Sequence, residues 1–441
     1  MSILKSIRLY HKLNHHMYRM KESDLKEYQL NQLKRLVEKM KEKSPFYGEL
    51  YGSRKIGSFS DYAELPIINK TIMMKEFDRI NTVGLNKSDC MKCAIKKELD
   101  KDYLGYYKDQ FVIGLSSGTS GNKGLFITPK TMTKQIPALF LARGGIRLSD
   151  LPIRILFMLR VFSQGFDDIN APFIKLSYLS TMTKVNDIIV SAKEKRINIL
   201  MAPPSLIREL LPRVSELPHF KRIITYAEVL EQEEKTRFIK AFKTEVVEIY
   251  QASEGQIASP CKCGNLHINE DLVYVELFSE SGTIVNEPGI VAAKMLISNL
   301  INEAQPLLRY EMNDLVVLGE KCPCGSSFRR IDHIIGRNDD VFRFLNQDKK
   351  LIPVYPDLIS RWIITVSDDI REFVATQIDD SSFNLVIDAP LSDQLSDAIK
   401  SRIEKELASY GIMVNLKIEF SKIDKPKNNQ KTKRFRSNIL K

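Results

Sequence analysis

The spacing of apolar side chains divides the chain into regions of different predicted secondary structure. From residue 2 to residue 43, apolar residues recur mostly every three or four positions among Lys, Glu and Gln, which predicts a pair of packing helices. From Phe111 onward, short β-rich runs alternate with helical stretches such as Val185–Arg196 and Gln232–Phe242. This alternation predicts a covered parallel sheet, whose expected strands are Phe111–Leu115, Ile197–Met201, Arg222–Ile224 and Glu245–Ile249.

After Gly289 the pattern changes to β-rich segments, including Ile290–Ile297 and Asp314–Leu318. The C-terminal part then reads as two strands, a helix and a strand, at Glu372–Gln377, Phe383–Ile387, Leu391–Ser409 and Met413–Phe420. We therefore predict an α/β protein. A large N-terminal domain with parallel or mixed sheets and helices is followed by a small, mobile α+β domain.

The composition and the charge limit the classes of function. The 441 residues are 43% hydrophobic and 27% charged, which is enough apolar material for a sizeable core. The net charge is +11, but residues 421–441 hold eight Lys or Arg and one Asp, so the other 420 residues carry only +4. The excess is one basic tail and not a basic domain. Because apolar runs such as Ile136–Ala142 are short and no signal peptide is visible, we expect a cytoplasmic protein without a membrane span.

A stretch rich in glycine and hydroxyl side chains, Leu115-Ser-Ser-Gly-Thr-Ser-Gly-Asn-Lys-Gly124, directly follows the predicted strand Phe111–Leu115. Small residues after a strand allow backbone N–H groups to approach phosphate oxygens closely, and Lys123 adds positive charge. The stretch lacks the Gly-Lys-Ser/Thr ending of a Walker loop. It favours a phosphate-binding loop, with an ordinary surface loop as the alternative.

This loop resembles the phosphate-binding signature of the adenylate-forming superfamily, which includes the acyl-CoA synthetases. Its form without proline is similar to the branch of phenylacetate–CoA ligase-like proteins, CapK proteins and deazaflavin-adenylating synthetases. Further segments resemble motifs of the superfamily or of this branch, in the family's order: Ala202-Pro-Pro-Ser205, Ala227-Glu228-Val-Leu230, Tyr250-Gln-Ala-Ser-Glu254, Gln305-Pro-Leu-Leu-Arg-Tyr310-Glu-Met-Asn-Asp314 and Gly336-Arg337-Asn-Asp-Asp340. The resemblance implies an adenylate-forming domain over residues 1–336, with a helical start over 1–50, and a lid domain over 337–441.

The resemblance also implies a role for each motif in the attack of a carboxylate on ATP, a reaction that depends on positioning and charge neutralisation. The implied ATP-binding residues are Ser116, Ser117, Gly118, Thr119, Ser120, Gly121, Lys123, Ala227, Glu228, Tyr250, Asp314 and Arg337. Glu254 would hold Mg²⁺, which prefers carboxylate and phosphate oxygens. The segment Gln430-Lys431-Thr-Lys-Arg434-Phe435 resembles the context of the family's C-terminal lysine, so Lys431 and Glu254 are the implied catalytic residues.

Six cysteines form three close pairs along the chain, and two of these pairs are Cys-x-Cys-Gly hooks. Four thiolates can close a tetrahedral Zn²⁺ site. We predict a structural zinc, over residues 261–324, held by Cys261, Cys263, Cys322 and Cys324 with His267 as a substitute ligand. Unliganded thiols are the alternative. The third pair, Cys90 and Cys93, has no second pair to complete a site, and we interpret it as incidental.

These features favour an enzyme that activates a small carboxylic acid, expected to be aromatic, with ATP and passes it to CoA. An adenylyltransferase that transfers AMP to a hydroxyl is the nearest alternative. A zinc-containing nucleic-acid-binding protein is an alternative of another class, disfavoured because Phe435 is the only aromatic residue in the basic tail. The expected partners are therefore the acid and CoA or another small acceptor, without nucleic acid or membrane. The oligomeric state is open, with a homodimer as one option.

Overall fold

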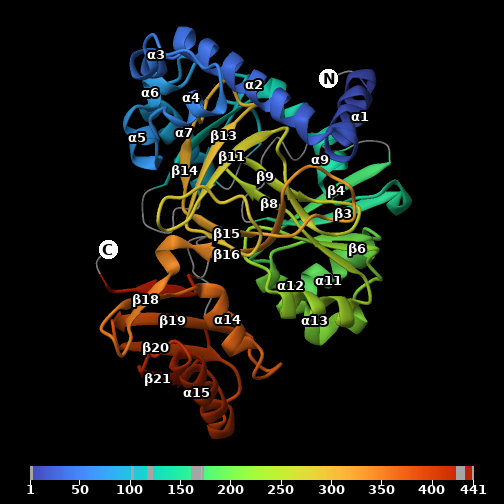
Figure 1. The fold of residues 1–441 in the computed structure, drawn as a ribbon. Helices are drawn as coiled ribbons and strands as arrows, with labels where there is room; N and C mark the ends of the chain where they lie inside the picture. Colours follow the sequence, from blue (N-terminus) through green and yellow to red (C-terminus); the bar gives the residue numbers. More distant parts are fainter. Residues whose placement is uncertain are drawn as a thin grey trace.

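The structure is a computed structural model that describes residues 3–100, 104–116, 123–159, 170, 173–423 and 433–439. Figure 1 shows a larger part that contains the N-terminus and a smaller part that contains the last helix and strands. We call residues 3–337 the large unit and residues 341–439 the C-terminal unit, because the latter share a hydrophobic core from Phe342 to Phe435. The predicted α/β class is confirmed, with both parallel and antiparallel sheets.

The predicted N-terminal helix pair is confirmed as α1 (Ile3–Arg19) and α2 (Glu22–Lys43). Five shorter helices follow: α3 (Pro45–Tyr51), α4 (Phe59–Ala63), α5 (Lys70–Lys75), α6 (Phe77–Ile80) and α7 (Lys87–Asp100). Three of them begin after a residue whose side chain accepts a hydrogen bond from a first-turn N–H group, namely Ser44, Ser58 and Asn69. These caps fix the first residues of α3, α4 and α5.

The predicted parallel sheet has the strand order β4-β3-β5-β6-β7. Its strands are β3 (Ile153–Leu159), β4 (Ile174–Ser180), β5 (Ile199–Met201), β6 (Arg222–Thr225) and β7 (Glu245–Glu248). Helices α11 (Val185–Glu194), α12 (Pro204–Leu210) and α13 (Gln232–Phe242) connect successive strands and bury apolar side chains against the sheet. A second cluster, to which α9 (Ile136–Arg143) contributes after the short α8 (Lys130–Thr133), buries other side chains of the same strands. The sheet is therefore covered, as its apolar strands require.

The prediction that Phe111–Leu115 belongs to this parallel sheet is wrong. The segment forms β1 (Phe111–Leu115), which pairs antiparallel with β2 (Leu125–Pro129) and sets Leu115 opposite Leu125. Only residues 116–124 connect the two strands, and a parallel pairing would need a longer crossover. The antiparallel pairing brings the two ends of the glycine-rich stretch side by side.

Two antiparallel sheets form the rest of the large unit, drawn mainly in yellow and orange in Figure 1. The six-stranded sheet has the order β12-β15-β16-β10-β9-β8 and contains β8 (Tyr250–Ala252), β9 (Gly255–Pro260), β10 (Leu266–Ile268), β12 (Val291–Ala292), β15 (Asp314–Leu318) and β16 (Arg330–Arg337). The three-stranded sheet has the order β11-β13-β14 and contains β11 (Val273–Phe278), β13 (Lys294–Asn299) and β14 (Tyr310–Met312). Both sheets share one large core with α2 and α3.

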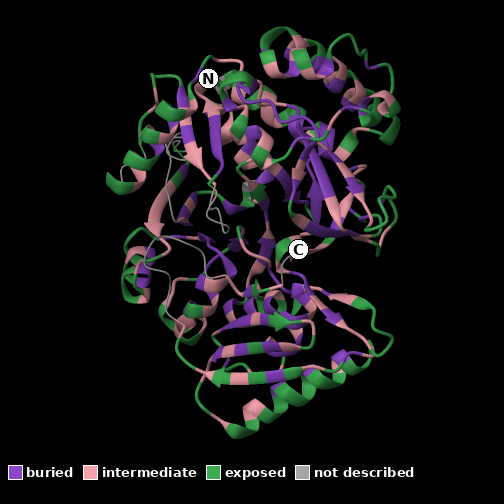
Figure 2. Cartoon of the chain, turned by 90° about the vertical axis from the view of Figure 1, so that its left-hand side faces the viewer, coloured by how far each residue is buried: buried purple, intermediate pink, exposed green. Residues whose placement is uncertain are grey.

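The C-terminal unit confirms the predicted strands and helix. After the hairpin β17 (Phe342–Leu345) and β18 (Leu351–Val354) comes α14 (Pro356–Ile364), followed by a sheet of order β21-β20-β19-β22 and the helix α15 (Asp393–Ala408). The sheet contains β19 (Glu372–Asp379), β20 (Ser382–Asp388), β21 (Asn415–Phe420) and β22 (Phe435–Ser437). Figure 2 shows buried residues along these strands and a largely exposed outer helix. Among the described residues, no helix is long and apolar enough to span a membrane.

Candidate active site

Asp314, Arg337 and Tyr250 come from separate motifs and meet at the ends of their strands in the six-stranded sheet. Asp314 begins β15 and Arg337 ends β16, and the two residues are directly paired across the strands. The Arg337 Nε lies 3.5 Å from Oδ1 of Asp314, and the Tyr250 hydroxyl donates a hydrogen bond to Oδ2 at 2.7 Å. Burial and the negative charge of Asp314 raise the pKa of Tyr250 well above its ordinary value, so the phenol remains a donor. Asp314 is thus held rigidly at a position where it can accept further hydrogen bonds.

Glu254 lies next to this group. Its backbone carbonyl accepts a hydrogen bond from the Asn299 side chain at 2.8 Å, and its carboxylate is 3.5 Å from the Tyr310 hydroxyl. Burial raises the pKa of Glu254, the charge of Asp314 raises it further, and the charges of Arg337 and Lys70 oppose the shift. A half-buried carboxylate beside a second carboxylate fits a bound cation. Glu254 would hold Mg²⁺ here, as the motif implies.

The glycine-rich stretch is described only at its ends. The Ser116 N–H donates to the Gly124 carbonyl at 2.8 Å, and the Gly124 N–H donates to Ser116 Oγ at 2.7 Å. Lys123 forms an ion pair with Glu98 on α7. The expected ligands Ser117, Gly118, Thr119, Ser120 and Gly121 lie outside the described residues. Their role in phosphate binding stays a prediction.

The structure adds Lys70, a residue that the sequence analysis did not identify. A Cβ built on Gly124 would lie 3.2 Å from Lys70 Cε and 3.2 Å from Ser116 Oγ, so the lysine lies beside the loop. Burial lowers the pKa of Lys70, Glu254 raises it and Arg337 lowers it, which places its charge near both residues. Lys70 lies far from the motifs in the sequence, and hydrogen bonds between Ile68 and the β14 segment help to bring it here.

The segment that contains Ala227 and Glu228, two of the implied ATP-binding residues, follows β6. Ala227 adopts a φ of +68°, a backbone conformation that favours glycine. The Tyr226 hydroxyl donates to the Met158 carbonyl. The Glu228 carboxylate accepts hydrogen bonds from the Ser205 hydroxyl at 2.9 Å and from the Ser205 N–H at 3.0 Å. The side chain of Glu228 therefore fastens this segment to the start of α12.

Lys431, the expected catalytic lysine, lies outside the described residues. The segment just after it is ordered by contacts with the C-terminal unit and the link to it. The Lys433 ammonium is 3.6 Å from Oδ1 of Asp340, and the Arg434 Nε is 2.6 Å from Oε1 of Glu372. Phe435 then begins β22, which pairs with β19. The tail is therefore anchored two residues beyond Lys431.

A cysteine–histidine cluster brings together three of the four cysteines predicted to bind zinc and the predicted substitute ligand, His267. The ligand atoms of Cys261, His267, Cys322 and Cys324 are buried and lie within 4.8 Å of one another. Cys263 is exposed and stands outside the cluster, because the turn of the first hook directs its backbone N–H toward the Cys261 sulfur at 3.3 Å. Thus the substitute ligand, His267, takes the place of the fourth cysteine.

The cluster has the chemistry of a metal site. The Cys261 and Cys322 sulfurs are 3.7 Å apart, and Cys324 Sγ is 3.6 Å from His267 Nε2. Tetrahedral Zn²⁺ with Zn–S bonds of about 2.3 Å requires sulfur atoms about 3.8 Å apart. His267 Nδ1 lies 2.8 Å from the Phe328 carbonyl, an arrangement in which Nδ1–H donates and Nε2 is left to bind the metal. These four residues would hold a structural Zn²⁺, and no open position remains among them.

Both hooks share one backbone requirement. Gly264 has a φ of +78° and Gly325 has a φ of +81°, so each Cys-x-Cys turn is closed by a glycine in the left-handed region. The Asn265 amide donates to the Cys322 sulfur at 3.1 Å, and the Ser326 N–H donates to the Cys324 sulfur at 3.4 Å. Donors directed at sulfur stabilise thiolates, the form that binds metal.

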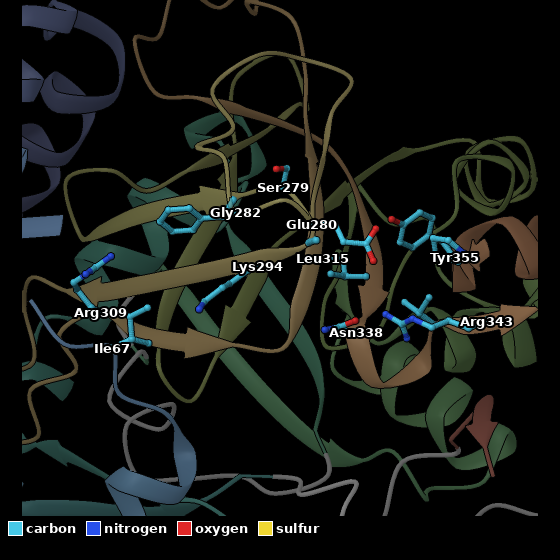
Figure 3. A pocket seen from close by; sticks show the side chains of 14 residues that line it. Ile67, Ser279, Glu280, Gly282, Lys294, Arg309, Leu315, Asn338, Arg343 and Tyr355 are labelled. Atoms are coloured by element: carbon cyan, nitrogen blue, oxygen red, sulfur yellow. The ribbon is translucent and has the colours of Figure 1, made fainter. Parts of the chain in front are cut away.

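A cavity of about 410 Å³ lies where the two units meet. Leu315 and Asn338, the neighbours of Asp314 and Arg337, line it. Figure 3 shows that Glu280 and Lys294 of the large unit and Arg343 of the C-terminal unit also line it. Because both units form the walls, the shape of this cavity depends on how the units are docked.

Comparisons with known proteins identify the fold. No protein-family model and no curated protein sequence matches the chain. Its fold is that of solved acid–CoA ligases. 2-Hydroxyisobutyryl-CoA ligase in the postadenylation state has a TM-score of 0.72 and 15% identity, with 95% of this chain and 90% of that chain covered. o-Succinylbenzoate CoA synthetase from Bacillus subtilis has a TM-score of 0.53 and 15% identity, with 73% and 67% covered.

Three structures of 2-hydroxyisobutyryl-CoA ligase give different agreement with this chain. The TM-score is 0.72 for the postadenylation state, 0.62 for an open conformation and 0.60 for the thioesterification state, with 14–15% identity in each case. More than 90% of each chain is covered in the two lower matches, 96% of this chain and 93% or 91% of the other. The two units of this chain are therefore arranged most like those of the postadenylation state.

Proposed function

We propose that this protein is an adenylate-forming ligase that activates a small carboxylic acid with Mg²⁺-ATP and transfers the acyl group to CoA. One observation carries the proposal: Asp314, Arg337, Glu254 and Lys70 converge beside the loop between Ser116 and Gly124. This convergence occurs on a fold shared with acid–CoA ligases. The domain boundary between residues 336 and 337 belongs to the same proposal.

In the first step, a carboxylate oxygen of the acid bonds to the α-phosphorus of ATP, and the bond from that phosphorus to the bridging oxygen breaks to release pyrophosphate. Asp314 accepts hydrogen bonds from the ribose, and its position is maintained by Tyr250 and Arg337. Lys70 balances the charge of the phosphates beside the loop. Glu254 would hold Mg²⁺, which would supply positive charge to the phosphates when bound. In the second step, the CoA thiolate attacks the acyl carbon and AMP leaves.

The same proposal includes the class of acid and the identity of the acceptor. An aromatic acid is the substrate class that the motif branch implies, and CoA is the acceptor of the 2-hydroxyisobutyryl-CoA ligase structures that share this fold. Transfer of AMP to a hydroxyl would use the same first-step residues. The two reactions differ in their products, because only the ligase releases free AMP when an acceptor thiol is present.

The experiment is a pyrophosphate-release assay with Mg²⁺-ATP and a panel of aliphatic and aromatic carboxylic acids, followed by CoA addition. We expect release to depend on one class of acid, and AMP to appear on addition of CoA. Lys70→Met should lower the rate by about 10²–10³-fold, the effect of one electrostatic donor, whereas Lys75→Met at the exposed end of α5 serves as its control. Release that is independent of every acid, or stable adenylylation of an alcohol, would contradict the ligase proposal.

A further inference from the structure

The two units also meet through a buried cluster of charged residues that no sequence motif contains. Arg208 of α12 has a side chain only 8% exposed, and its Nη1 lies 3.4 Å from Oε2 of Glu372 in the C-terminal unit. The same nitrogen donates to the Arg371 carbonyl at 2.9 Å. Two other pairs, Arg237–Asp368 and Glu233–Arg361, cross the interface nearby but are more exposed. Exposed pairs contribute little, so Arg208 carries most of the charged contact.

Each partner in this contact has a second partner on its own unit. Arg208 Nε lies 2.5 Å from Oε1 of Glu234 on α13, and Glu372 Oε1 lies 2.6 Å from Arg434 Nε. If the units separate, Arg208 keeps Glu234 and Glu372 keeps Arg434. Neither buried charge is left alone, so the contact between Arg208 and Glu372 can form and break without the large penalty of an unpaired ion.

The helix that carries Arg208 is also fastened to the candidate nucleotide site. Ser205, one turn earlier on α12, donates two hydrogen bonds to Glu228 of the segment after β6. On the other side, Arg434 lies three residues after Lys431 in the sequence and its guanidinium lies 5.1 Å from the Phe373 ring centre. A continuous set of contacts therefore joins residue 228, α12, the start of β19 and the tail.

We infer that Arg208 is a positioning residue that latches the C-terminal unit, through Glu372, in the orientation seen here and couples that orientation to the nucleotide segment. This inference rests on the proposed function and on the three states of 2-hydroxyisobutyryl-CoA ligase, with which this chain agrees to different degrees. The latch favours the arrangement that resembles the postadenylation state. Its reversible pairing lets the C-terminal unit leave for the second step.

The latch is tested by the docking of the units in the full chain, measured by small-angle X-ray scattering and by hydrogen exchange of residues 371–376 at about pH 8. Both are measured without nucleotide and with Mg²⁺-ATP. Arg208→Met should lower the ratio of docked to undocked protein about tenfold or more, because Glu372 then faces Glu234 and Glu228 with Arg434 as its remaining cationic partner. Arg213→Met is the matched control, since Arg213 contacts Glu216 at 2.6 Å and Asn186, both in its own unit.

A second variant separates pairing from simple loss of packing. Adding Glu372→Gln to Arg208→Met removes the unpaired carboxylate, so docking should recover most of the lost ratio. Docking unchanged in Arg208→Met, or no recovery in the double variant, would overturn the latch. Calorimetry of ATP binding separates the two proposals: absence of ATP binding by the wild type contradicts the proposed function, while docking without nucleotide still decides the latch.

Discussion

The cysteine–histidine cluster and the nucleotide site are both assembled from distant parts of the chain, but their surroundings differ. In the cluster, four buried ligand atoms face one another, and hydrogen bonds to the Phe328 carbonyl and from Asn265 hold them. In the candidate nucleotide site, Asp314 and Glu254 are half-buried, and burial and the charge of Asp314 raise the pKa of Glu254. A site closed by protein atoms stabilises the fold, whereas half-buried carboxylates with a perturbed pKa are typical of a site that binds a ligand.

The strongest test of this comparison is removal of one cluster ligand. Cys322→Ser should release the metal and lower the melting temperature markedly, because structural Zn²⁺ contributes on the order of 10 kcal/mol to folding in small zinc domains. Metal content by elemental analysis and thermal unfolding are the measurements. Cys263→Ser, in the same hook pair but outside the cluster, should keep both the metal and the melting temperature. Protein that contains no metal when purified without chelators would remove the zinc proposal.

The nucleotide site should respond most to Lys431. Lys431→Ala should slow acid-dependent pyrophosphate release by about 10²–10³-fold, since one electrostatic donor stabilises the charge of the transition state by that amount. ATP affinity and the consumption of a preformed acyl-adenylate should change little. Lys433→Ala is the control, because Lys433 contacts Asp340 in the link between the units. If Lys433→Ala lost more activity than Lys431→Ala, the assignment of the catalytic role to Lys431 would be wrong.

Removal of the Asp314 carboxylate, which we propose to bind the ribose, should have an effect on ATP binding rather than on the fold. Asp314→Ala should weaken ATP binding by about 1–3 kcal/mol, the value of hydrogen bonds to a charged group. Isothermal calorimetry measures this change. Tyr250→Phe removes one donor to Asp314 and keeps the carboxylate, so its loss of affinity should be smaller. Equal ATP affinity in Asp314→Ala and the wild type would rule out the ribose assignment.

The docking of the two units should depend on pH through Glu372. Burial raises the pKa of Glu372 to about 7, the Arg208 charge lowers it, and Glu228 and Glu234 raise it. Arg434, on the same unit, also faces this carboxylate. When the units separate, the carboxyl returns toward its ordinary pKa, so the docked state binds the extra proton. The extra proton therefore favours docking at low pH, and this contribution is lost as the pH rises through about 7, which leaves the docking that the Arg208–Glu372 ion pair supports.

Scattering between about pH 6 and pH 8 should show the docked ratio fall about tenfold, the effect of one linked proton. Glu372→Gln should remain docked over the whole range, because its side chain cannot ionise. A wild-type ratio that rises with pH would contradict this assignment.

Local patterns in the sequence were sufficient to predict many of the helices and strands. The spacing of apolar residues over 2–43 and in the C-terminal part predicted α1, α2, β19, β20, α15 and β21. This was possible because the period of a helix or a strand appears in the spacing of residues that are close in sequence. Which strands pair with each other could not be predicted as well from these local patterns. Phe111–Leu115 has the composition of a buried parallel strand, but its partner is selected by the short connection to Leu125–Pro129.

For the candidate site, the sequence by itself determined which residues have the right chemistry: Asp314, Glu254, Arg337 and the cysteine hooks. Tertiary structure alone decided which of them meet. His267, and not Cys263, lies in the cluster, because the turn of the hook directs the Cys263 thiol outward and β10 places the imidazole inward. The tertiary structure also added Lys70 and Arg208, whose neighbours lie far along the chain. Long-range contacts follow from packing and strand order, which no local spacing of residues records.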